Sequence, residues 1–485
     1  MQGSRSRGRG AISSGLLTGI STAFVSGSAA VAAVILSRKF GHGVKTDGFF
    51  VAYGIYLAVV LVTSVVRIVA LPRFVRARAD ARLGGEVGVW VAALSGPLAL
   101  AVALAVAWPH GVASVFTGEP QARHYAAELL PWLIASAAAQ VLGGVVASAL
   151  AALDDYGTAA FGFAFGSVAG IALTVALIGH GVIAFAWGIA LNGALSLGIP
   201  LTVLAWKRGL ARPDHPPWTR LVELGEGVTL PVALQGFFLV GNRFASGIET
   251  GDVSTFSYAF LIASFLVSLT AASLALVSTV PFAREGGSPE RAARHVVAVS
   301  WLSLAPIAAA ASVFALAGAA VTSRVLGAKY GGPTGAELSR LVVYLAPWMV
   351  ASVAFTIAYP LLFVRGRARW LPVLAVVALL VHVPVEWGGR AAFGLGGIAA
   401  GMAVTTALVL FVVLGALGAL ERTLRGLAVA AAVCGGAAAL LFGVPGALLG
   451  RVAAAALGLA LYALLLALWR PAGLRHAWAY VRALQ

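Results

Sequence analysis

The sequence is poor in charged residues and almost free of cysteine. Only 10% of its 485 residues are charged, whereas 60% are hydrophobic. A soluble domain carries roughly 25% charged residues. This composition therefore excludes a soluble domain and indicates a protein that crosses a membrane many times. The single cysteine, Cys434, lies in an apolar stretch. A disulfide framework and a cysteine-built zinc site are therefore both excluded.

A nucleotide-binding loop is also lacking. No Gly-x-x-x-x-Gly-Lys-Ser/Thr pattern occurs, so ATP does not drive this chain directly. We expect no bound cofactor, and a membrane transporter rather than an enzyme.

What is present is a series of apolar stretches, each long enough to cross about 30 Å of hydrocarbon as a helix. They predict an all-α integral membrane protein with about 14 transmembrane helices. The predicted spans are 11–36, 49–71, 87–108, 126–153, 156–178, 182–206, 227–246, 253–281, 296–321, 341–363, 370–387, 393–418, 426–446 and 450–469.

Basic residues are unevenly shared between the two sides of this arrangement. If the N-terminus is cytoplasmic, 22 of the 33 lysines and arginines fall in cytoplasmic segments and nine in outer ones. The positive-inside rule therefore predicts that both termini are cytoplasmic. It also explains the net charge of +16 without a nucleic-acid partner. Arginine far outnumbers lysine, which indicates GC-rich bacterial coding and hence the bacterial cytoplasmic membrane.

The chain divides into two predicted lobes. The longest polar connection, 207–226, contains three prolines and follows six helices. The second and eighth helices each start near an aspartate, Asp47 or Asp252, and each carries an aromatic-alanine element. We interpret this as a pseudo-two-fold repeat of six helices around a central cavity. The expected parts are an N-lobe (1–206), a cytoplasmic linker (207–226), a C-lobe (227–418), and a C-terminal helix pair with a tail (419–485).

Two motifs carry a resemblance to a known family. The first is Gly41-His42-Gly43 followed by Thr46-Asp47-Gly48-Phe49-Phe50-Val51-Ala52; the second is Asn242-Arg243-Phe244-Ala245-Ser246 followed by Val253-Ser254 and Tyr258-Ala259. Both resemble motifs of the lipid II flippase (MurJ, MVF-type) family of the multidrug/oligosaccharidyl-lipid/polysaccharide (MOP) flippase superfamily. The family has an alanine where this chain has Gly48.

The resemblance implies a site for an anionic, lipid-linked cargo. Arg243 matches the family's Asp-Arg pair, and its guanidinium can bind phosphate oxygens bidentately. Arg67 lies within a predicted span, where it either lines the cavity or reaches toward the membrane surface. Asp47 either belongs to this site or caps the second helix together with Thr46. The family's further cavity arginines are replaced by Val60-Leu61 and Phe260-Leu261, so the expected cavity is less cationic.

The coupling ion is predicted to be H⁺ or Na⁺. His382 and Glu386 are four residues apart and share one helix face. By position, the family's sodium site falls on Asn242, His382, Glu386 and Thr405 or Thr406. However, Asn242 replaces an acid and His382 replaces an asparagine. A histidine beside a carboxylate can carry a proton near neutral pH, which makes proton coupling the competing interpretation.

We therefore expect a secondary-transport flippase that moves a lipid-linked oligosaccharide or peptidoglycan precursor across the membrane by alternating access. Its expected partners are this substrate, membrane lipids and glycosyltransferases of the same pathway. A cation-coupled multidrug exporter is one alternative, but such an exporter needs more acids within its spans. A scaffold of an envelope glycan pathway without transport activity is another.

Overall fold

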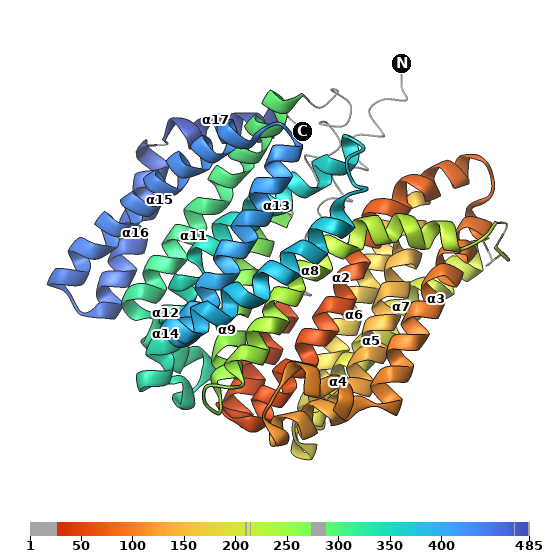
Figure 1. Cartoon of the computed structure of the whole chain (residues 1–485), viewed down its shortest axis with the longest axis horizontal. Helices are drawn as coiled ribbons and strands as arrows, with labels where there is room; N and C mark the ends of the chain where they lie inside the picture. The colour runs from red at the N-terminus through yellow and green to blue at the C-terminus, as the bar shows by residue number, and fades with distance from the viewer. Residues whose placement is uncertain (1–26, 209–210, 214, 273–287, 470, 484–485) are drawn as a thin grey trace. The chain divides into compact units, whose positions relative to one another are not determined.

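The computed structural model describes residues 27–208, 211–213, 215–272, 288–469 and 471–483. The described residues contain helices and no strand, which confirms the predicted all-α class. The chain separates into two compact units, unit 1 up to Gly251 and unit 2 from Asp252 (Figure 1).

Unit 1 contains a helix at 27–40 followed by seven more α-helices. These are α2 (Val44–Ala79), α3 (Leu83–Ala107), α4 (Pro109–Phe116), α5 (Pro120–Ala152), α6 (Tyr156–Ala176), α7 (Ile183–Arg208) and α8 (Trp218–Ala245), with a 3-10 turn at Ile178–His180.

Unit 2 contains the remaining helices, with a π-helical turn at Ser268–Ala272 and a 3-10 turn at Ala328–Tyr330. The helices are α9 (Asp252–Val267), α11 (Pro289–Leu326), α12 (Gly332–Tyr344), α13 (Ala346–Val364), α14 (Leu371–Ala416), α15 (Leu420–Leu448), α16 (Arg451–Trp469) and α17 (Ala472–Ala483).

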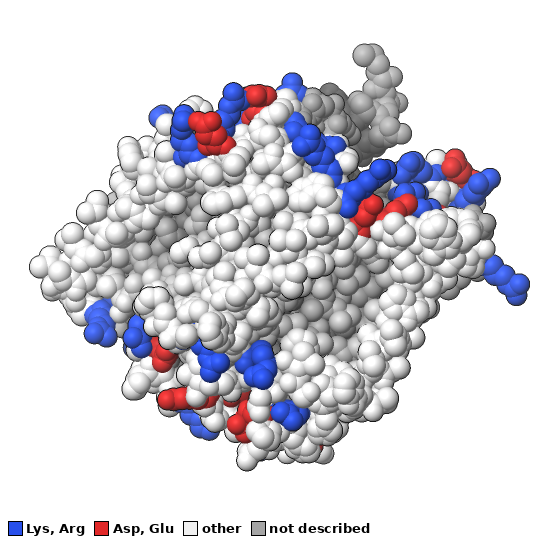
Figure 2. Space-filling model, in the orientation of Figure 1, with Lys and Arg blue, Asp and Glu red and all other residues white. Residues whose placement is uncertain are grey.

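Among the described residues, twelve helices are long and apolar enough to cross a membrane. The second to fourteenth predicted spans each fall on one of them, with the eleventh and twelfth on the two halves of α14. The first predicted span, 11–36, begins outside the described residues, and so does the end of the eighth. On the face of the molecule that Figure 2 shows, charged residues gather toward two opposite edges and leave a broad uncharged band between them, as hydrocarbon requires.

The core of unit 1 is built around α5, of which most residues are buried. Small residues let its neighbours approach closely. A Cβ on Gly144 would lie 2.5 Å from the Thr63 side chain of α2, and one on Gly143 would lie 3.1 Å from the Ser196 carbonyl oxygen of α7. Small residues are the usual means by which helices pack tightly in membranes, where apolar surface alone gives little drive for association.

Several predicted helix boundaries need correction. Helix α2 runs through Pro72 to Ala79, well beyond the predicted end at 71. Helix α8 begins at Trp218, directly after Pro217, so the non-helical connection is shorter than 207–226. Unit 1 also includes α8, which packs against α2, α3 and α4. The tail after α16 forms a further helix, α17. The division into repeated six-helix lobes stays a prediction.

Candidate functional site

Helix α14 is broken at Gly394, which has φ 59° and ψ −134°. Glycine tolerates this left-handed backbone because it has no Cβ. The two halves then approach each other closely, since a Cβ on Gly389 would lie 2.5 Å from the Gly397 carbonyl oxygen. Further from the break, the same packing brings His382 and Glu386 of the first half against the second half.

The contacts across the break fix the protonation of His382. The Thr405 hydroxyl donates to the Gly401 carbonyl at 2.9 Å, so its oxygen is left to accept from Nδ1 of His382 at 3.1 Å. Nδ1 therefore carries a hydrogen. On the other side of the ring, Nε2 lies 3.1 Å from Oε2 of Glu386. This second contact has the distance of an ion pair, but Oε2 has no hydrogen-bond partner within the described residues.

The pair is fully buried. His382 and Glu386 are both 0% exposed. Both carboxylate oxygens of Glu386 and Oγ1 of Thr406 are buried and find no hydrogen-bond partner within the described part of the chain. Such an unsatisfied oxygen is costly unless an ion or proton reaches it. Among the residues that the structure describes, no cluster of three or more histidines, cysteines or acids could hold a metal ion. One carboxylate and one imidazole fit a proton better than a hard cation, which needs several oxygen ligands.

The predicted ion-coupling residues are divided between the two units. Unit 2 brings together His382, Glu386 and Thr405, and it also buries Thr406. Asn242 belongs to unit 1, where it is fully buried on α8. Its amide lies beside α2, because a Cβ on Gly54 would be 3.6 Å from Nδ2. A role for Asn242 in ion binding stays a prediction.

Arg243 lies in the last turn of α8 and is exposed. Its guanidinium lies beside the turn between α4 and α5, since a Cβ on Gly118 would be 3.2 Å from Nη1. The same turn is tied to α8 by a hydrogen bond from the Gly118 backbone N–H to Ser246 Oγ at 3.2 Å. Glycine at 118 thus leaves room for an arginine that unit 1 holds in place and exposes.

Asp47 is a buried anchor at the start of α2. Its side chain is not the N-cap, because the helix begins at Val44 after Gly43 and has no side-chain cap. Instead, Oδ2 accepts from the backbone N–H of Gly251 at 2.7 Å, and Asp47 is 3% exposed. Gly251 has φ 97°. Thr46 is buried too and donates to the Gly41 carbonyl at 2.7 Å. Asp47 is thus shielded from solvent in this structure.

The structure also explains why glycine stands at position 48, where the resembling family has alanine, and how Arg67 is accommodated. A Cβ on Gly48 would lie 2.7 Å from the Ala122 carbonyl oxygen of α5, so even alanine is too large here. Arg67 is exposed, and its guanidinium lies 5.0 Å from the centroid of the Phe163 ring. This cation–π contact partly compensates for placing a charge on a membrane helix.

An ion-pair network at the opposite end of α8 was missed by the sequence analysis. Arg220 donates to both carboxylate oxygens of Glu86, at 3.0 and 3.2 Å, and to Glu223 at 3.1 Å. Arg73 of α2 reaches Glu223 at 2.5 Å, and His215 lies 3.0 Å from Arg220. These charges fix the start of α8 on α2 and α3. Their sequence separation, up to 150 residues, hid the network.

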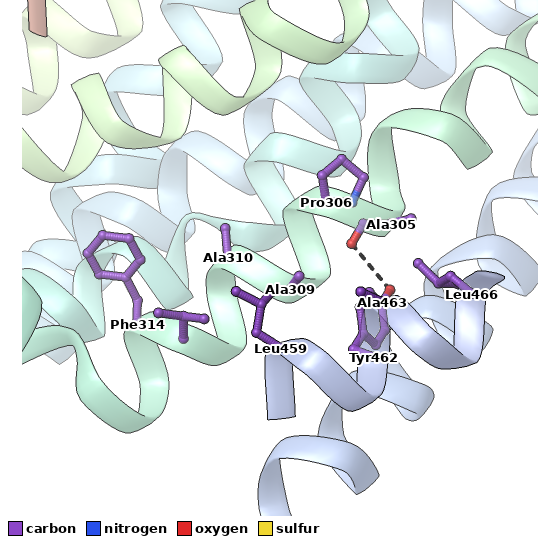
Figure 3. A pocket seen from close by; sticks show the side chains of 10 residues that line it. Ala305, Pro306, Ala309, Ala310, Phe314, Leu459, Tyr462, Ala463 and Leu466 are labelled. Atoms are coloured by element: carbon purple, nitrogen blue, oxygen red, sulfur yellow. Dashed lines mark hydrogen bonds between the residues drawn. The ribbon is translucent and has the colours of Figure 1, made fainter. Parts of the chain in front are cut away.

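Unit 2 also carries an apolar groove of about 490 Å³ between α11 and α16. Figure 3 shows that side chains of both helices line it and that the Tyr462 hydroxyl is turned toward the Ala305 carbonyl. This hydrogen bond, 3.2 Å long, satisfies the hydroxyl. Such a lining accommodates hydrocarbon. Its residues are Ala305, Pro306, Ala309, Ala310, Val313, Phe314, Leu459, Tyr462, Ala463 and Leu466.

No protein-family model matches the chain, and no curated protein matches it. Solved structures do share its fold, which is that of the all-α membrane transporters of the MOP superfamily. A lipid II flippase MurJ in an inward closed conformation matches with a TM-score of 0.73 at 12% identity, over 94% of this chain and 99% of that one.

Multidrug transporters have the same fold. An inward-facing MATE transporter matches with a TM-score of 0.62 at 16% identity, over 83% of this chain and 94% of that one. A MOP transporter from Pyrococcus furiosus matches with 0.55 at 14% identity, over 86% and 96%. Identities this low establish the fold alone.

Proposed function

We propose that the protein is a secondary-transport flippase that moves a lipid-linked oligosaccharide or peptidoglycan precursor across the bacterial cytoplasmic membrane by alternating access. The observation that carries this proposal is a difference in solvent exposure between basic and acidic side chains on the long helices. Arg243 is exposed, whereas Asp47 and Glu386 are buried within the protein. An exposed guanidinium favours an anionic headgroup. The fold shared with a lipid II flippase supports the same cargo class.

We propose that both termini are cytoplasmic, because 22 of the 33 basic residues then lie on the cytoplasmic side. The cargo headgroup is built by cytoplasmic glycosyltransferases in this scheme, and they are the partners that we expect.

We further propose that the coupling ion is a proton carried between His382 and Glu386. With Nδ1 already donating to Thr405, loss of the shared proton leaves a carboxylate facing the lone pair of Nε2. That arrangement is repulsive in a dry interior, where charge interactions are poorly screened. Deprotonation would therefore separate Glu386 from His382 and loosen the packing of the two halves of α14.

The alternative is a cation-coupled multidrug exporter, which the fold of the MATE transporters keeps open. An accessible carboxylate would attract an organic cation. Asp47 and Glu386 do not provide one in this structure, because each is at most 3% exposed.

Flipping and export are distinguished by reconstituting the purified protein into vesicles with two probes, a fluorescent lipid-linked oligosaccharide and a fluorescent organic cation. Headgroups that have moved to the outer leaflet become sensitive to an added quencher. We expect protein-dependent loss of fluorescence with the lipid and no movement of the cation. Cation movement without lipid movement would overturn the proposal, and movement of neither would favour a scaffold.

A further inference from the structure

The end of unit 2 where α11, α15 and α17 meet forms a strongly basic surface. Helices α11 and α15 both begin there, since Arg422 of α15 pairs with Glu290 of α11 at 2.9 Å. Five exposed arginines and two exposed glutamates lie near the starts of these helices. The arginines are Arg291, Arg294, Arg422, Arg425 and Arg475. We refer to these five residues as the basic end.

Both glutamates are already engaged. Glu290 pairs with Arg422, and Glu421 pairs with Arg425 at 3.0 Å. The basic end therefore keeps a net excess of positive charge.

Helix α17 is held on this surface in a fixed rotation. Ala477 is completely buried among residues of α11 and α15. A Cβ on Gly473 would overlap the indole of Trp301, and the Tyr480 hydroxyl lies 3.1 Å from Nδ1 of the buried His295. One face of α17 is thus packed against the protein, and the opposite face must point outward.

The outward face of α17 combines a cation with a large aromatic ring. Arg475, His476 and Trp478 are exposed, and Trp478 is 52% exposed. Exposed tryptophan next to arginine is typical of the headgroup level of a bilayer, where the ring meets the acyl boundary and the cation meets phosphate. The position of α17 fits this level, because only two residues separate it from the membrane helix α16.

We infer that the basic end and Trp478 form a binding surface for anionic phospholipid headgroups of the leaflet around unit 2. Its net positive charge complements anionic headgroups, which attract each nearby arginine with enough energy to change binding about fivefold. This inference does not depend on the cargo or on the coupling ion.

The test uses the full chain with Cys434→Ala, which removes the only cysteine, and with a fluorophore on Ala479→Cys, an exposed position of α17. Vesicles contain phosphatidylcholine with a small fraction of quencher-labelled phosphatidylglycerol or, separately, quencher-labelled phosphatidylcholine. We expect severalfold stronger quenching by the anionic lipid. Arg294→Gln and Arg475→Gln should each reduce the preference about fivefold.

The matched control is Arg451→Gln, an exposed arginine at the other end of α16, which should leave the preference unchanged. Unaltered melting temperatures show that the variants are folded. Equal quenching by both lipids, or a preference that survives both substitutions, would overturn the inference. So would a label shielded from both lipids in proportion to protein density, which would indicate a second copy of the chain on this surface.

Discussion

Oε2 of Glu386 and Nε2 of His382 lie 3.1 Å apart in a fully buried pair, and the opposite ring nitrogen is already committed to Thr405. In the proposed mechanism one proton is shared by the pair, because an unsatisfied carboxylate is costly in a dry interior. Since the two residues lie on one half of a broken helix and Thr405 on the other, the proposed protonation would act on the packing of α14. This link between a proton and a helix break is the basis of the coupling mechanism proposed above.

The packing against Glu386 can be tested with a single methyl group. A Cβ on Gly401 would lie 3.1 Å from Cγ and 3.2 Å from Cα of Glu386, so Gly401→Ala must displace the first half of α14. We expect a loss of about 1 kcal/mol in stability, typical of slight overpacking, and at least tenfold slower transport. Gly388→Ala on the same helix meets nothing within 4 Å and serves as the control. Equal transport by both variants would show that this contact does not matter.

Arg243 should bind the cargo through its charge. We expect Arg243→Ala to reduce transport at least tenfold without affecting membrane insertion, and Arg243→Lys to retain part of the activity, because lysine keeps the charge but loses bidentate geometry. Ser246→Ala removes the hydrogen bond to the Gly118 N–H but keeps the arginine side chain. It therefore separates the positioning of Arg243 from its charge. Vesicle flipping assays measure all three. Full activity of the alanine variant at 243 would remove this residue from the site.

Asp155 should contribute to stability at neutral pH. It caps α6 by accepting from the Thr158 N–H at 3.0 Å and pairs with Lys207 at 2.5 Å. Partial burial raises its pKa, but the bonds from Lys207 and Thr158 outweigh this effect and hold the pKa below its usual range. Because the folded pKa is depressed, the stabilisation is present above the unfolded pKa and is lost as pH falls through the folded pKa.

Asp155→Ala should therefore lower stability by about 1 kcal/mol at pH 7, the usual contribution of a helix N-cap. The difference from wild type should shrink toward pH 3. Thermal melts of the detergent-solubilised protein at several pH values measure it, and a difference independent of pH would contradict the assignment.

The proposed topology predicts the location of two reporters. Fusions after Arg212, between α7 and α8, and after Gln485 should both report a cytoplasmic position. A periplasmic signal from either would show that the orientation or the number of spans is wrong.

The sequence predicted the membrane class and most helices because the length of an apolar stretch is a local property. Helix ends were less predictable. Helix α2 continues through Pro72 because its last turns pack with unit 1, as the buried Phe74 shows. The break in α14 at Gly394 depends on a backbone angle that the amino-acid sequence does not reveal.

The candidate site was predictable to the extent that it follows helical spacing. His382 and Glu386 were recognised because they are four residues apart. The bond between Asp47 and Gly251 joins residues 204 positions apart, and that between Arg73 and Glu223 joins residues 150 apart. No periodic pattern indicates such partners, so their pairing required the folded structure.

The most direct test of proton-coupled flipping is transport of a lipid-linked oligosaccharide in sealed vesicles under a pH gradient and, separately, under a sodium gradient. We expect the wild-type protein to respond to the pH gradient and not to require sodium. Glu386→Gln should lose the pH response, because a carboxamide cannot release the shared proton. Stimulation by sodium that weakens in Glu386→Gln while the pH response persists would contradict the proton mechanism, and wild-type behaviour of this variant under both gradients would show that the pair is only structural.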